Sequence, residues 1–297
     1  QEEEADRANK EGYSKHDPAE ALYGLEDAEN AIEHFKSAPE GEWLELFPNI
    51  SVRFQYNGHI IGATFIELNV EGKKIVFSGD IGRSEDVLMR TPKKPVEADV
   101  LIIESTYGDR THPKDNLEEK LTTIINTTFE KGGTLIIPSF AVERTQTLMY
   151  LLWQLRTKNL IPNIPMIMDS PMGANVLEVF KNHSEWHKLP VEDCIAMWET
   201  WEIIDDNRPK IIIAGSGMIT GGRVLTYLRF YIGLPETTLL LAGFQAEGTR
   251  GRKLLEGAED VKIQGKYYPV KANVVNLQVL SSHADQPELI DWMSAIQ

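Results

Sequence analysis

The sequence contains very little cysteine. Cys194 is the single cysteine among 297 residues, which excludes an internal disulfide and any zinc site built from cysteines. A metal ion would therefore have to be held by histidine and carboxylate side chains. Cys194 itself is expected to be a small buried apolar residue.

The sequence also lacks long apolar runs and a positive net charge. No stretch approaches membrane-spanning length and no secretory signal is recognisable, so we expect a soluble, cytoplasmic protein without a membrane partner. The net charge is −15, of which residues 1–45 carry −10 through 14 acidic and 4 basic side chains. Because the acidity is concentrated there, a local basic track elsewhere remains open, whereas indiscriminate affinity for nucleic acid is not expected.

The spacing of the apolar residues predicts an α/β protein. Residues 50–77 alternate like strands, with a turn at Glu71 and Gly72, and from residue 104 onward apolar strands alternate with helical segments. This alternation is typical of a mostly parallel sheet with helices on both faces. The expected strands are 100–103, 134–138, 166–168, 211–214, 238–242, two short ones from 261, and 274–280; the expected helices are 117–131, 143–155, 174–180, 222–231 and one from 286.

Two further helices are expected before the first strand. Asp17, Pro18 and Glu20 have the order of a helix start, and residues 25–35 place apolar side chains at helical spacing. We expect both helices to serve packing, because no chemical motif accompanies them.

Three potential ligands or proton carriers stand at or near strand ends, where scaffolds present chemistry. His59 follows the strand that ends near residue 56, Asp80 follows 75–77, and Glu104 follows 100–103. Neighbouring glycine and serine residues leave room for a metal ion or a phosphate group. For each residue, the alternative is a hydrogen-bonded structural role.

The sequence motifs around these residues resemble those of the metallo-β-lactamase-fold nucleases of the β-CASP family. The likeness begins with residues 58–63 (GHIIGA), 78–80 (SGD) and 104–108 (ESTYG). It continues through 138–146 (PSFAVERTQ), 169–172 (DSPM), 216–218 (SGM) and 281–285 (SSHAD).

The resemblance implies a fold with three segments. They are part of a metallo-β-lactamase αββα fold at 1–108, an inserted β-CASP domain at 109–253 built on a mostly parallel sheet flanked by helices, and a return segment at 254–297.

The resemblance also implies a pair of zinc ions and assigns roles beside them. His59 matches a zinc ligand, and Asp80 matches the carboxylate that bridges both ions. His283 matches a histidine thought to protonate the leaving oxygen, and Glu104 matches an acidic residue that orients the surrounding shell.

The other histidines show no matching motif. His183 and His187 are spaced for a metal site on a helix but lie in a polar stretch, so we expect them at the surface. His112 lies close to the 104–108 motif, and the sequence leaves its role open.

Several residues near strand ends are candidates for holding a phosphodiester chain. Hydroxyls, one glycine N–H and two guanidinium groups suit phosphate oxygens, although helix capping or surface ion pairs are the alternative for each. The candidates are Ser139, Arg144, Ser170, Ser216, Gly217, Arg223 and Thr249.

Two motifs of the β-CASP family do not occur in the 297 residues. The H-x-H-x-D-H segment, which supplies most zinc ligands, and the terminal His-Gly-Glu are both absent. We therefore expect a chain truncated at both ends that binds zinc weakly and cuts poorly.

The leading hypothesis is a zinc-dependent ribonuclease that leaves 5′-phosphate and 3′-hydroxyl ends. The preference for RNA rests on 138–146 and 281–285, which look more like the RNA-processing branch of the family. The alternatives are a non-catalytic RNA-binding or scaffold subunit of a processing complex and, less favoured, a small-molecule hydrolase. A homodimer or a larger RNA-processing complex stays open, as does endonuclease against exonuclease action.

Overall fold

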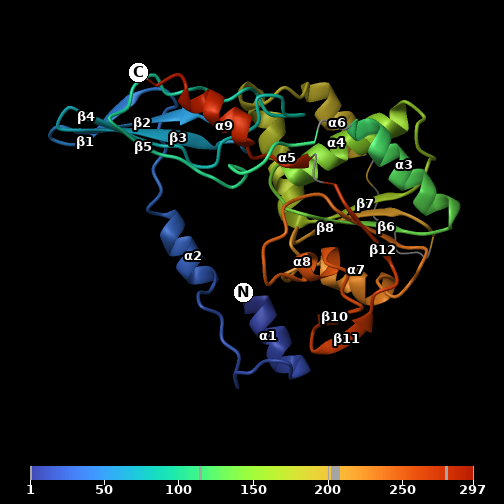
Figure 1. The fold of residues 1–297 in the computed structure, drawn as a ribbon. Helices are drawn as coiled ribbons and strands as arrows, with labels where there is room; N and C mark the ends of the chain where they lie inside the picture. Colours follow the sequence, from blue (N-terminus) through green and yellow to red (C-terminus); the bar gives the residue numbers. More distant parts are fainter. Residues whose placement is uncertain (1, 114–115, 200, 202–207, 278–279, 297) are drawn as a thin grey trace.

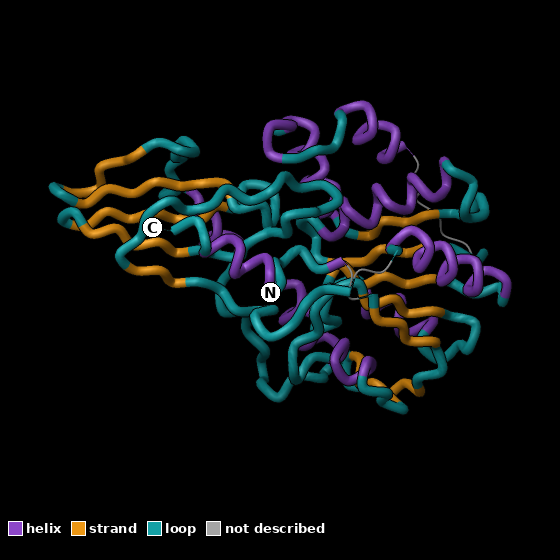
Figure 2. The backbone as a smooth tube through the Cα atoms, turned by 45° about the horizontal axis from the view of Figure 1, so that its top comes forward, coloured by secondary structure: helices purple, strands orange, loops and turns teal. Residues whose placement is uncertain are grey.

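Two five-stranded sheets form the framework of the protein (Figure 1). The computed structural model describes residues 2–113, 116–199, 201, 208–277 and 280–296. Figure 2 shows the two sets of strands as separate groups joined by loops. Within the described residues, no helix is long and apolar enough to cross a membrane.

The first sheet has the order β1-β2-β3-β4-β5 and is antiparallel except for the parallel β4–β5 pair. Glu71 and Gly72 connect β3 to β4 with φ values of +52° and +85°, which confirms the predicted turn. The strands are β1 (Trp43–Phe47), β2 (Ile50–Tyr56), β3 (Thr64–Val70), β4 (Lys73–Phe77) and β5 (Val100–Ile102).

Helix α9 (Gln286–Met293) covers part of the first sheet. Its Trp292 ring meets the Phe65 ring edge-on, with the ring centres 5.4 Å apart, in a small buried apolar cluster. The helix begins sharply because the Asp285 side chain accepts a hydrogen bond from the N–H of Glu288, and Glu288 returns the bond. The residues just before α9 are thereby fixed against the first sheet.

The second sheet is entirely parallel and has the order β12-β9-β6-β8-β7. Its edge strand β12 comes from the last part of the chain and pairs with β9. A separate hairpin of β10 and β11 precedes it. The strands are β6 (Leu135–Ser139), β7 (Met166–Asp169), β8 (Ile211–Gly215), β9 (Thr238–Leu241), β10 (Asp260–Ile263), β11 (Lys266–Pro269) and β12 (Asn273–Asn276).

Helices cover both faces of the second sheet. Ile137 belongs to the apolar core on one face and its neighbour Ile136 to the core on the other, as strand alternation requires. One face carries α3 (Leu117–Glu130), α4 (Arg144–Thr157), α5 (Pro171–Asn182) and α6 (Val191–Glu199), with a 3₁₀ turn at Ser184–Trp186; the other carries α7 (Val224–Tyr231) and α8 (Arg250–Leu255). The predicted α/β class and its parallel, helix-flanked sheet are confirmed.

The structure differs from the predictions near the N-terminus. A helix does occur at α1 (Glu2–Glu11), but none starts at Asp17, because the backbone of Ala19 is hydrogen-bonded to the side chain of Asn9. Helix α2 (Leu25–Ile32) has no buried residue, and Phe35 beyond it is 78% exposed, so the expected packing is wrong here. The predicted strand 274–280 ends earlier, at Asn276, and residues 278–279 lie outside the described part.

Candidate metal centre and active site

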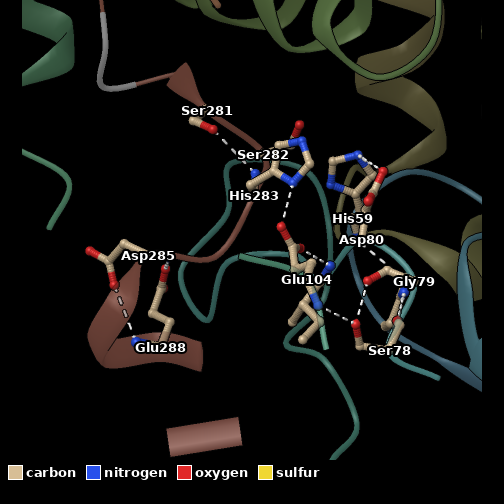
Figure 3. Close-up of polar contacts among 12 residues, drawn as sticks. His59, Ser78, Gly79, Asp80, Glu104, Ser281, Ser282, His283, Asp285 and Glu288 are labelled. Carbon is tan, nitrogen blue, oxygen red and sulfur yellow. Dashed lines mark hydrogen bonds and ion pairs between the residues drawn. The ribbon is translucent and has the colours of Figure 1, made fainter. Parts of the chain in front are cut away.

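His59, Asp80 and His283 come together at one point, although they lie far apart in the sequence (Figure 3). One potential ligand atom from each lies within 4.8 Å of the other two. Nε2 of His59 is 3.7 Å from Oδ2 of Asp80, and the two imidazole ring centres are 4.4 Å apart. The expected convergence of these three side chains is therefore seen.

Backbone contacts between loops of the first sheet position the first two of these groups. His59 lies in the loop after β2, and Asp80 lies in the loop after β4. The Asn57 side chain donates to the carbonyl of Ser78 at 3.0 Å, and the Gly82 N–H donates to the carbonyl of Asn57 at 2.8 Å.

The two loops approach so closely that only glycine fits at one position. A Cβ on Gly82 would lie 2.0 Å from the carbonyl oxygen of Gly58, which is a severe clash. Gly58 itself has a φ of +70°, and a Cβ there would lie 2.8 Å from the carbonyl oxygen of Arg90. Main-chain contact thus fixes the distance between the His59 loop and the Asp80 loop.

Glu104 supports His283 from behind. Its Oε2 accepts a hydrogen bond from Nδ1 of His283 at 3.0 Å, and its Oε1 accepts one from the N–H of Ile81. Burial alone would raise the pKa of Glu104, but the hydrogen bond and charge of His283 outweigh it and hold that pKa below its ordinary value. An ionised carboxylate on Nδ1 leaves Nε2 of His283 as the nitrogen free for a ligand or a proton.

The donor set fits a zinc ion. Burial first, and then the nearby imidazole of His283, lower the pKa of His59 and favour its neutral, metal-binding form. Nε2 of His59 lies 3.7 Å from Oδ2 of Asp80, so the neutral ring can present this nitrogen to an ion beside the carboxylate. Two imidazoles and one carboxylate are ligands that zinc accepts.

Comparisons with known proteins point the same way. Residues 145–254 match the family model described as the Beta-Casp domain, and residues 267–297 match the Zn-dependent metallo-hydrolase RNA specificity domain. Ribonuclease TTHA0252 of Thermus thermophilus is 33% identical over 92% of this chain and 67% of its own length. The RNase J-like protein of Methanocaldococcus jannaschii is also 33% identical, over 92% of this chain and 68% of its own length.

The chain belongs to the β-CASP family of metallo-β-lactamase-fold ribonucleases. Endoribonuclease ysh1 of Schizosaccharomyces pombe is a more distant relative, 29% identical over 92% of this chain and 38% of its own length. The predicted family and the predicted fold class, a metallo-β-lactamase fold with a β-CASP insertion, are both confirmed. The chain spans about two thirds of the first two relatives.

Arg144 belongs to the β-CASP domain and lies next to the metal site. It begins α4, its guanidinium donates to the hydroxyl of Ser282 at 3.4 Å, and only 7% of the residue is exposed. Among the described residues, no carboxylate lies within ion-pair distance of it, so its charge is buried with little compensation. A guanidinium in this state, next to His283, attracts an anion.

The remaining predicted substrate contacts lie at or after the carboxyl ends of β-CASP strands, and the side-chain polar groups of the serines, Thr249 and Arg223 already have partners within the chain. Ser170 and Thr249 cap α5 and α8, and Ser216 hydrogen-bonds within its own loop. Ser139 is buried between Thr145 and the carbonyl of Phe140, and Arg223 forms an ion pair with Asp169; Gly217 lies against the ring of Phe140.

The sequence did not point to Glu143, which adjoins the site in the β-CASP domain. The N–H of Arg144 donates to the carbonyl of Val142, and Glu143 between them has φ +65° and ψ −57°, a γ-turn that is rare for a non-glycine residue. Its carboxyl is buried, with Oε1 accepting from Thr147, and Oε2 has no hydrogen-bond partner among the residues that the structure describes. Burial, with a contribution from Asp86, raises the pKa of Glu143 to about 7 against the opposing effect of Arg144.

The other histidines have structural roles. His112, whose role was open, hydrogen-bonds through Nε2 to the carbonyl of His283 at 2.9 Å, and its backbone N–H donates to the carboxylate of Asp285. His183 is exposed as expected, but His187 is buried, because both of its ring nitrogens bond to backbone groups, the carbonyl of Phe180 and the N–H of Leu189. Cys194 is buried, as predicted.

Proposed function

We propose that the protein is a zinc-dependent ribonuclease that hydrolyses RNA phosphodiester bonds to 5′-phosphate and 3′-hydroxyl ends. The observation that carries the proposal is the meeting of His59, Asp80 and His283 at one point, with Glu104 behind His283. The names of its relatives, a ribonuclease and an endoribonuclease, support RNA as the substrate. We take the segments 1–108, 109–253 and 254–297 as its working units, noting that β12 of the last segment pairs with the second sheet.

His59 and Asp80 would hold zinc, with two ions in the complete enzyme. When bound, zinc supplies Lewis-acid chemistry that makes a water molecule nucleophilic near neutral pH. Asp80 would suit a bridging position, because its carboxylate offers two oxygens and its side chain is 61% exposed. The three donors gathered among the described residues are fewer than two ions require, so we infer that this chain alone holds zinc weakly and cleaves slowly.

The chain's own residues complete the reaction. Glu104 orients His283 so that Nε2 can deliver a proton to the 3′-oxygen as the bond from phosphorus to that oxygen breaks. Arg144 would hold a non-bridging oxygen of the phosphate. Further candidate contacts with the RNA lie along the strand ends; they are Ser139, Ser170, Ser216, Gly217, Arg223 and Thr249.

The test is zinc binding and RNA cleavage by the Asp80→Ala variant. We expect the zinc affinity measured by calorimetry to fall by at least tenfold, and cleavage of end-labelled RNA to fall by orders of magnitude, because a bridging ligand is lost. Asp291→Asn is the matched control, since Asp291 is an exposed carboxylate whose partner is Lys94. Undiminished zinc binding and cleavage by Asp80→Ala would refute the assignment. A parent chain that binds RNA without any metal-dependent cleavage, even at saturating zinc, would favour a scaffold role.

A further inference from the structure

A largely apolar cavity opens next to the metal site. Its volume is about 450 Å³, and its polar end is formed by Arg144, Ser282 and the two site histidines. The rest of the wall is mostly apolar, with Glu143 and Ser281 as its other polar residues. The apolar side chains of the wall are those of Ile60, Phe140, Val142, Met172, Met218 and Phe244.

Two phenylalanine rings in this wall are open to solvent at the carboxyl ends of β-CASP strands. Phe140 follows β6 and Phe244 lies just beyond β9, and each is 44% exposed. Side chains of this size are normally buried, so exposed rings gathered in one cavity indicate a binding surface.

The Phe140 ring is held in place by the backbone. A Cβ on Gly217 would lie 2.7 Å from the nearest carbon of that ring, so the ring occupies the space that any other residue would need. Phe244 is held from another side, with its ring edge-on to Tyr107 at a centre distance of 6.3 Å. Both rings are therefore fixed flat surfaces rather than loose side chains.

We propose that this cavity is a base-binding subsite, in which one unpaired nucleobase of single-stranded RNA stacks on Phe140. The inference rests on the proposed ribonuclease function and names the part of the substrate that lies beside the bond to be cut. A nucleobase has an apolar face for a ring and for Met172 and Met218 around it, and its own phosphate would reach the polar end at Arg144. A base within a duplex is covered on both faces by its neighbours and would not enter.

Gly217 acquires an additional role under this proposal. The sequence suggested that it exposes a backbone N–H to phosphate, and the close approach of its backbone to the ring adds the support of Phe140. It is a positioning residue, because it acts on the base through the ring.

The experiment measures binding of a short single-stranded RNA that carries one 2-aminopurine, whose fluorescence falls when it stacks. With the 297-residue chain, we expect quenching at one position of the label and little quenching when the same label lies in a duplex. Phe140→Leu should weaken binding about tenfold and abolish the quenching, because stacking on one ring contributes ~1–3 kcal/mol. Phe140→Tyr should restore both, and Gly217→Ala should lower both while the ring is still present.

Phe230→Leu serves as the matched control, since Phe230 is an exposed phenylalanine on α7 outside the cavity wall. Thermal unfolding of each variant verifies that the fold is retained. Equal quenching by Phe140→Leu and the parent, or equal quenching in duplex and single strand, would overturn the proposal.

The readout needs no cleavage, so it is separable from the proposed function. Position-specific quenching with no cleavage leaves the subsite standing and counts against the ribonuclease. Cleavage that is insensitive to an abasic nucleotide at every position leaves the ribonuclease standing and overturns the subsite. If an apolar dye fills the cavity and single-stranded RNA does not displace it, the proposal is also overturned. A protein side chain would then be the favoured occupant.

Discussion

The two sheets of the protein differ in how completely they are covered. The strands β6, β8 and β9 of the second sheet are buried almost throughout, with helices on both faces. The first sheet leaves large apolar side chains exposed, among them Phe47, Phe77 and Ile102. Yet the first sheet and the segment leading into α9 carry the metal donors, whereas the second carries Arg144 and Phe140. The best-buried sheet and the metal donors thus lie largely in different regions. The cavity between these regions is lined by residues of both.

The largest expected effect separates the two sheets by stability. Ile213→Ala in β8 removes a fully buried side chain, and we expect it to lower the free energy of unfolding by roughly 2–5 kcal/mol. Ile102→Ala in β5 truncates a side chain that is 46% exposed, and we expect a change within about 0.5 kcal/mol. Urea unfolding of both variants measures the contrast. Equal losses would show that the exposed face of the first sheet is covered in solution.

The next effect tests the support of His283 by the first region. Glu104→Gln removes the charge that holds His283, and we expect RNA cleavage to fall roughly 10- to 100-fold with little change in stability or zinc affinity. Cleavage of end-labelled RNA at saturating zinc measures the loss. Glu97→Gln is the control, because Glu97 is exposed and pairs with Lys74. Unchanged cleavage by Glu104→Gln would mean that His283 acts without the support of this carboxylate.

A third effect lies at the boundary, where Glu143 of the second region faces Asp86 of the first. Because the folded pKa of Glu143, about 7, lies above the ordinary value of 4.5, the folded state holds this proton more tightly. The stability that this bound proton contributes is fully present below pH 4.5 and is lost as the pH rises through 7. Glu143→Gln keeps the acceptor for Thr147 and removes the titration, so we expect it to gain stability over the parent between pH 5 and 8, by roughly 3 kcal/mol at the upper end.

Urea unfolding at several pH values measures this difference. Glu178→Gln on α5 is the control, since Glu178 is exposed and its partner is Lys181. A stability difference between Glu143→Gln and the parent that stays constant with pH would contradict the raised pKa.

The smallest effect distinguishes two arginines of the second region. Arg144 has no ion-pair partner among the described residues, whereas Arg223 is bound to Asp169 at 2.8 Å. We expect Arg144→Gln to weaken RNA binding severalfold. The slope of the logarithm of the binding constant against the logarithm of the salt concentration should become shallower by about 0.7, the value for one phosphate contact with a single strand. Arg223→Gln should change both less, because its charge is already compensated. Fluorescence binding at several salt concentrations compares them, and a larger loss for Arg223→Gln would reverse this order.

Much of the second sheet was predictable from the sequence, because its strands are short, continuous apolar runs, as expected for a parallel sheet that is covered on both faces. Ile211–Gly215 is an example, and the predicted strand 211–214 differs from it by one residue. The convergence of His59, Asp80 and His283 was predictable from motifs rather than from periodicity, since nothing local to 59 indicates its distance from 283.

Features that depend on contacts between distant segments were not predictable. The helix expected at Asp17 fails because Asn9 takes the backbone groups of Ala19. The burial of His187 depends on the carbonyl of Phe180, and the Phe140 platform depends on the backbone of Gly217. In each case the local pattern fits more than one structure, and a partner elsewhere in the chain selects among them.

The contact of Gly82 with Gly58 has a consequence for motion in the cleft. Because the main chains of the two loops touch with no side chain between them, His59 and Asp80 cannot drift apart independently. Any opening or closing around a substrate would carry both donors as one unit and would change only their distance to groups of the second sheet, such as Arg144 and Phe140. The spacing of His59 and Asp80 would therefore stay constant while the second sheet, with its fixed Phe140 ring, shifts as a body.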